Sequence, residues 1–142
     1  MIDTVLQYSL SYFTVTMILV YILNIPQLVT NDKKGLIKEY YYDNFTNVII
    51  FDYFLIALYL AAGLYLIHLF ETKNTFDNII VIALTTILIS GMFALYFLSG
   101  PEDETFFSRW FHSVHQFAVV YDVILLVCVY VLYDYLKNIL KY

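Results

Sequence analysis

Asp52, His115 and Asp122 are ionisable residues that stand inside long apolar runs of this chain. Two of them fall in the stretch WFHSVHQFAVVYDVILL, residues 110–126. A carboxylate among apolar residues is costly to bury, so an intramembrane carboxyl is by default a candidate proton or cation site. The alternative is a protonated carboxyl that donates a hydrogen bond and joins two helices. Asp122 is compatible with both interpretations, and the sequence leaves both open.

The two histidines of this stretch are candidate metal or haem ligands. His112 and His115 are three residues apart and would share one face of a helix. A closed metal site needs about four ligands. His68, the third histidine, lies at the end of the second apolar run that faces the other side of the membrane, so it cannot join His112 and His115. We therefore predict no metal and no cofactor, and hydrogen bonding at the membrane interface for the pair. Since no base stands near a nucleophile in a recognisable motif, we also expect no catalytic residues and no enzymatic activity.

The elements that must position these residues follow from the composition. The chain has 142 residues, of which 62% are hydrophobic and 13% charged, whereas a soluble domain is about 45–50% apolar and about 25% charged. Four apolar runs have the length of about 20 residues that a helix needs to cross the hydrocarbon layer. They cover residues 5–25, 48–70, 78–98 and 114–136. We predict one all-α transmembrane domain over residues 1–142, a four-helix bundle with both termini on the same side.

Depth along these spans predicts which polar residues meet. We call the side with both termini side A and the opposite side side B. At about 1.5 Å per residue, Asp52 lies about 6 Å inside the side-B edge and Asp122 about 15 Å inside it, near the midplane. His115 matches Asp52 in depth, so we predict a contact between the two. We expect Asp122 to face the bundle and to bond one of the hydroxyl groups at its depth, those of Tyr59, Thr86, Ser90, Thr14 or Thr16.

The spans themselves carry two further signals. The first begins with Asp3 rather than with basic residues, which predicts a retained span and not a cleaved signal peptide. Small residues within 57–63 and within 90–94 predict a close seam between the second and third spans, because small side chains let helix backbones approach.

The connections predict where the chain meets the membrane surface. Residues 71–77 are predicted to form a tight helical hairpin. The acidic run Glu102–Glu104 is expected in the first turn of the fourth helix, where the helix dipole favours negative charge. That helix then begins outside the hydrocarbon layer and carries four interface candidates: Phe106, Phe107, Arg109 and Trp110. A short interfacial helix over 35–45 would hold three more at headgroup level: Tyr40, Tyr41 and Tyr42.

Charge restricts the partners but not the orientation. The net charge of −5 argues against nucleic acid as a partner, because nucleic acid binding requires a basic face. The basic residues divide almost evenly between the two sides, so the positive-inside rule gives no orientation. Asn44 begins a glycosylation sequon on side B, and the sequence does not decide whether it is used. Cys128 is the single cysteine, so an intrachain disulfide is impossible.

Two segments resemble a known group of proteins. FFSRWFHSVHQFAVVYDVILLVCVYVLYDYL, residues 106–136, resembles the last span of small four-span membrane proteins of nucleocytoplasmic large DNA (giant) viruses, and FDYFLIALYL, residues 51–60, resembles their second span. The shared pattern is paired aromatics, then Trp-Phe, then Ala-Val-x-Tyr-Asp-Val-Ile-Leu ending at Leu125. The resemblance implies a protein of the virion's internal membrane under an icosahedral capsid. It implies no catalytic residues, and it leads us to expect a small residue such as glycine where this chain has His115.

The leading hypothesis is therefore a structural or assembly protein of a membrane, the internal membrane of a large DNA virus virion or a host membrane. Its partners would be the lipid bilayer and other membrane or capsid proteins, bound through the side-B loops, and self-association stays open. One alternative is a small proton- or ion-translocating protein that uses Asp122. Another is an accessory subunit of an organellar membrane complex.

Overall fold

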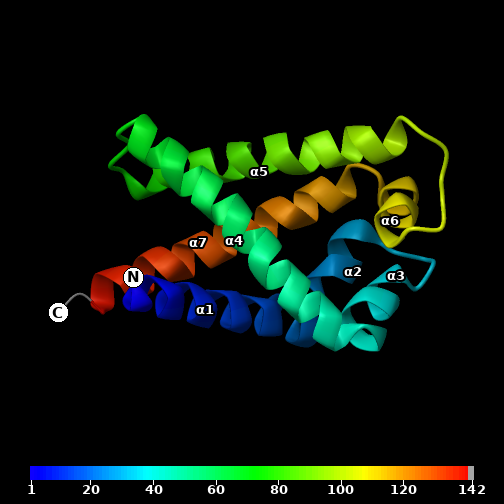
Figure 1. The fold of residues 1–142 in the computed structure, drawn as a ribbon, viewed down its shortest axis with the longest axis horizontal. Coiled ribbons are helices and arrows are strands. Elements are labelled where there is room, and N and C mark those ends of the chain that lie inside the picture. Colours follow the sequence, from blue (N-terminus) through cyan, green and yellow to red (C-terminus); the bar gives the residue numbers. More distant parts are fainter. Residues whose placement is uncertain (141–142) are drawn as a thin grey trace.

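The structure, a computed structural model, describes residues 1–140, and helices are its only regular elements within that range. Figure 1 shows their arrangement. In chain order they are α1 (Ile2–Thr16), the π-helix η1 (Met17–Ile22), α2 (Ile25–Thr30), α3 (Leu36–Lys38), the π-helix η2 (Glu39–Asp43), α4 (Phe45–Leu69), α5 (Thr75–Leu98), α6 (Phe106–Val114) and α7 (Phe117–Ile139).

Four of these helices are long and apolar enough to cross a membrane: Ile2–Ile22, which joins α1 to η1, and then α4, α5 and α7. This confirms the predicted all-α, four-span bundle, with bounds that differ by a few residues. Helices satisfy their own backbone hydrogen bonds, as a lipid environment requires. Large apolar side chains cover the outside of the bundle, for example Phe54 at 67% exposure and Leu95 at 72%. The chain is an integral membrane protein, and these side chains face lipid.

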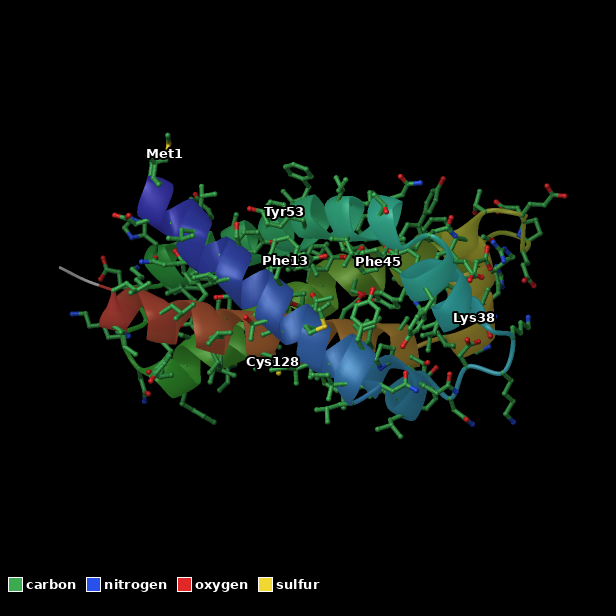
Figure 2. All side chains as sticks on the ribbon, turned by 90° about the horizontal axis from the view of Figure 1, so that it is seen from below. Met1, Phe13, Lys38, Phe45, Tyr53 and Cys128 are labelled. Carbon is green, nitrogen blue, oxygen red and sulfur yellow. The ribbon has the colours of Figure 1, made fainter. Side chains whose placement is uncertain are left out.

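The packing order places α7 at the centre. α7 packs along both α5 and α1, and α4 packs mainly on α5. The start of α1, the α4–α5 turn and the end of α7 lie at one end of the bundle, which is side A (Figure 1). Met1 and Lys38 mark the two opposite ends in Figure 2. The short helices α2, α3, η2 and α6 gather at the other end, and we call them the side-B cap.

Tyrosines join α1 to α4. Tyr8 donates a hydrogen bond to the backbone carbonyl of Tyr53, and Tyr12 donates to that of Ile49 at 3.0 Å. The rings of Phe13 and Tyr53 stack with centroids 5.9 Å apart, and Figure 2 shows both side chains at this contact. Each phenol buries its ring in the bundle and satisfies its hydroxyl on a backbone carbonyl of α4.

The seam between α4 and α5 is close, but its register differs from the predicted one. A Cβ on Gly63 would lie 2.5 Å from Cδ1 of Ile82, so Gly63 is where the two helices approach. Gly91, expected in the same seam, has open space around it. The helices form an antiparallel hairpin around residues 70–74, and this sets Gly63 opposite Ile82 rather than opposite residues 90–94.

The chain enters the side-B cap through tight backbone turns. Asn24 and Asn31 bound α2 in the left-handed conformation, with φ of 53° and 50°. Asparagine tolerates this region better than most residues. The Asp32 carboxylate then accepts hydrogen bonds from the backbone N–H groups of Lys34 and Ile37, which fixes the start of α3. The predicted interfacial helix over 35–45 is present as α3 and η2.

The fourth span differs from its prediction. The chain does not continue as one helix from residue 102, because α6 ends at Val114 and α7 begins at Phe117. His115 stands in the break, with φ 51° and ψ −131°, a backbone conformation that favours glycine. The acidic run Glu102–Glu104 is also not in a first helical turn, since α6 begins only at Phe106. Instead the Asp103 carboxylate accepts hydrogen bonds from the backbone N–H and hydroxyl of Thr105, which shapes a turn before the helix.

Candidate intramembrane site

Asp122 lies on α7 and faces the bundle. The hydroxyl of Ser90, a fully buried residue of α5, donates to Asp122 Oδ2 at 2.5 Å. The predicted orientation of Asp122 is thus confirmed, and its partner Ser90 is one of the five hydroxyl residues predicted to lie at the same depth. The bond joins α7 to α5, the helix with which α7 makes its most extensive contact.

Asp52 is buried on α4 and has a different partner from the predicted one. The phenol of Tyr40 in η2 donates to Asp52 Oδ1. The predicted contact with His115 is wrong: His115 is exposed, and no hydrogen bond or ion pair joins it to Asp52 in residues 1–140. The prediction placed His115 on a continuous fourth helix, whereas the break before α7 turns it away from the spans. His115 therefore does not belong to the intramembrane polar site.

A third polar pair completes this region. The hydroxyls of Tyr41 and Tyr121 lie 2.8 Å apart and are buried, so they join η2 to α7. Burial, and then the neighbouring Asp52, raise the pKa of the Tyr40 phenol far above its ordinary value, which keeps the hydroxyl protonated as the donor to Asp52. The segment Glu39–Asp43 thus contributes one phenol to α4 and one to α7.

A cavity of about 160 Å³ lies among η2, α4, α5, α6 and α7. Both carboxyls, Asp52 and Asp122, are in its wall. Most of the remaining wall is aromatic, with rings that include Tyr59, Phe97, Phe106, Phe107, Trp110 and Phe111. Helix α6 therefore closes the side-B end of the cavity. The site is a mainly apolar chamber with two acids in its wall, the general form of a small-molecule site.

Comparisons with models of protein families, with curated proteins and with solved structures found no match to this chain. The function of the cavity must therefore be inferred from its own geometry and chemistry.

The predicted interface aromatics mostly pack on one another. The rings of Tyr40 and Phe106 stack with centroids 4.6 Å apart, and Phe106 stacks on Trp110 at 6.1 Å. Phe107 also lies against Tyr40. Tyr41 is only 6% exposed, so its predicted position at headgroup level is wrong, whereas Tyr42 is 51% exposed. The cause is the fold-back of η2 over the bundle, which directs two of three consecutive tyrosines inward.

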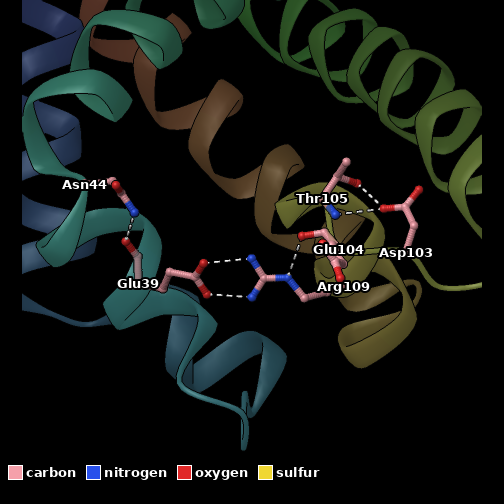
Figure 3. Close-up of polar contacts among 6 residues, drawn as sticks. All are labelled: Glu39, Asn44, Asp103, Glu104, Thr105 and Arg109. Carbon is pink, nitrogen blue, oxygen red and sulfur yellow. Dashed lines mark hydrogen bonds and ion pairs between the residues drawn. The ribbon is translucent and has the colours of Figure 1, made fainter.

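Arg109 holds the cap together from outside the cavity. Its guanidinium makes two hydrogen bonds of 2.7 Å to the Glu39 carboxylate, and its Nε–H reaches the carbonyl of Glu104 (Figure 3). Arg109 holds the pKa of the Glu39 carboxyl below its usual range, and the same carboxylate raises the pKa of Arg109. Lys34 and Glu102 form a second, longer ion pair at 3.9 Å. These contacts join the 26–47 segment to the α5–α6 connection.

Sequence reasoning found the two acids of this site but missed most of its wall. Tyr40, Phe97 and Phe111 come from three segments that have no local pattern in common. No signal in the linear sequence relates them, because they meet only when η2 and α6 fold over the ends of α4, α5 and α7. His112 follows the wall residue Phe111 in the sequence, and its Nε2 is buried without a hydrogen-bond partner in the described part of the chain.

Proposed function

We propose that this protein is an architectural component of a membrane, which joins its four spans through polar contacts and offers the side-B cap to other proteins. The observation that carries this proposal is that each intramembrane carboxyl bonds a hydroxyl of a different element. Asp122 joins α7 to α5, and Asp52 joins α4 to η2. Hydrogen bonds between helices stabilise membrane proteins by roughly 0.6 kcal/mol each, and they also fix the relative positions of the helices.

The membrane we propose is the internal membrane of a large DNA virus virion. The resemblance of residues 106–136 and 51–60 to the viral four-span proteins supports this location. The surface that would meet capsid or membrane proteins is the outside of the cap, where Lys33, Lys38 and Glu102 are exposed. Mass spectrometry of purified virions, before and after detergent extraction of the internal membrane, tests the location. We expect the protein in the detergent-released fraction, and its presence in cellular membranes alone would contradict the proposal.

The second candidate is a small proton- or cation-translocating protein. The specific observation in its favour is that Asp52 and Asp122 line one cavity. A path across the membrane would also have to continue toward side A. There the bundle is densely packed by Leu126, Val129 and Tyr130, each at most 2% exposed. This packed layer favours the architectural role over translocation.

Flux measurements in proteoliposomes separate the two candidates. Asp122→Asn removes the titratable group but keeps an oxygen that can accept from Ser90, whereas Asp122→Leu removes the acceptor as well. We expect no proton or cation flux with the wild type, and a lower melting temperature in detergent for Asp122→Leu, by roughly 1 kcal/mol of stability. Asp134→Asn, on the same helix but outside the cavity, is the matched control and should leave stability unchanged. Wild-type flux that Asp122→Asn abolishes at unchanged stability would make Asp122 a transport site.

A further inference from the structure

The cavity has the size of a small ring compound. Its volume is about 160 Å³, and an apolar protein cavity of about 150 Å³ is large enough to hold benzene. The cavity lies where α4 and α5, which meet at the side-A turn, diverge toward α6 (Figure 1). Phe51 and Phe93 line it and are also 48% and 44% exposed on the outer surface. These two rings separate the cavity from the lipid, so an amphipathic guest has a short route to it.

Each of the two carboxyls in the cavity wall has only one oxygen that accepts a hydrogen bond from the protein. Tyr40 occupies Oδ1 of Asp52, and Ser90 occupies Oδ2 of Asp122. The second oxygen of each carboxyl has no hydrogen-bond partner among residues 1–140. The phenol of Tyr59, also in the wall, has no partner in the same range. The cavity wall therefore holds one free carboxyl oxygen on α4 and another on α7.

No lysine, arginine or histidine lines the cavity in the described part of the chain. The guanidinium of Arg109 lies over the ring of Phe106, a wall residue, but it is paired with Glu39 and does not line the cavity. A buried carboxylate requires a partner of opposite charge, and the protein supplies none. A divalent metal is a poor candidate for this place, because Ca²⁺ and Mg²⁺ take six or more oxygen ligands and most of the wall is aromatic. Aromatic rings instead attract organic cations through their negative faces.

We propose that this cavity binds a small organic ammonium ion, a protonated amine that carries an apolar group the size of one ring. The ammonium group donates to a free carboxyl oxygen of the wall, on Asp52 or on Asp122, while the other acid lines the same cavity and adds electrostatic attraction. The apolar group packs against the rings of α5 and α6. The same chemistry operates whether the protein is architectural or translocates ions, so this site is independent of the proposed function.

The chain carries its own reporter for a test. Trp110 is the single tryptophan of the sequence and lines the cavity. Cyclopentylamine, which is protonated near neutral pH, and cyclopentanol, its neutral counterpart of equal size, are both transparent where tryptophan absorbs. Titration of each into the purified full-length protein in detergent, followed by Trp110 fluorescence, compares the cation with the matched alcohol.

We expect the amine to bind the wild type at least about tenfold more tightly than the alcohol, since each tenfold step needs only about 1.4 kcal/mol. Asp52→Asn and Asp122→Asn should each weaken amine binding while leaving alcohol binding unchanged, and Asp134→Asn should change neither. Equal binding of both compounds, or binding of neither, would overturn the proposal. So would amine binding that both cavity variants retain at full strength. If a variant does not fold, the wild-type comparison of amine and alcohol still decides the question.

Discussion

A serine hydroxyl and a phenol hold the two carboxyls of the spans, and only one of these partners was foreseeable. Ser90 and Asp122 both lie on long regular helices, so a constant rise per residue places them at one depth. Tyr40 lies only twelve residues before Asp52 in the sequence. Its side chain reaches Asp52 because η2 folds back over the bundle. The depth argument, which uses the rise per residue of a regular span, could not predict this contact.

Tyr40→Phe tests the contact with Asp52. The substitution keeps the ring in its stack with Phe106 and removes only the hydroxyl, so Asp52 loses its donor. We expect a loss of about 1 kcal/mol in stability, measured as a lower melting temperature in detergent. Tyr42→Phe is the matched control, because Tyr42 is exposed and adjacent in the sequence, and it should have no effect. Equal melting temperatures for the two variants would show that the Tyr40 hydroxyl does not support the fold.

Two places decide how the helices meet. The break at His115 separates α6 from α7 and lets α6 turn across the side-B end of the cavity. The approach at Gly63 sets the register of α4 against α5. The first carries no recognisable sequence signal, since residues 106–136 contain no glycine or proline that would mark a helix break. At the second, small residues correctly marked a seam, but small size alone does not say which residue lies opposite.

Gly63→Ala should destabilise the α4–α5 hairpin through one identifiable atom. The new Cβ would meet Cδ1 of Ile82, which is 1% exposed and has little room to move. We expect a loss of about 1–3 kcal/mol. Ile82→Val removes that Cδ1, so the cost of Gly63→Ala should be smaller in the Ile82→Val background.

A double-mutant cycle of thermal stabilities in detergent measures this coupling. Gly91→Ala serves as the control, because a Cβ there meets nothing within 4 Å, and it should be neutral or slightly stabilising. If Gly63→Ala costs the same with valine or isoleucine at position 82, the close contact is not the cause of the loss.

The whole molecule consists of a lipid-facing bundle and a cap at its side-B end. The ion pair of Glu39 with Arg109 joins segments seventy residues apart in the chain. Both side chains are about one-third exposed, 37% for Glu39 and 31% for Arg109, so salt screens the pair and its contribution is modest. Its value lies in position, because it fastens α6 to η2, two of the elements that line the cavity.

The cap should loosen in acid. Since the folded-state pKa of Glu39 is lowered, its contribution to stability is present above the unfolded glutamate pKa of about 4.3 and is lost as the pH falls through the folded value. The melting temperature of the wild type should exceed that of Glu39→Gln at neutral pH, and the difference should shrink below about pH 4.3. Glu71→Gln, exposed at side A, is the control. A difference that persists unchanged in acid would exclude the charged pair as its source.

The sequence by itself determined that the protein is an all-α membrane bundle and that Asp122 faces the interior of that bundle. Apolar length fixed four helical spans, because a lipid environment leaves the backbone few alternatives, and regular helix geometry then predicted that Asp122 meets a hydroxyl at its own depth. Tertiary structure alone decided the partner of Asp52, the exclusion of His115 and the aromatic cavity. The physical reason is that these features depend on where short cap segments and one helix break direct the chain, and such directions arise from packing between distant residues rather than from the period or composition of any one segment.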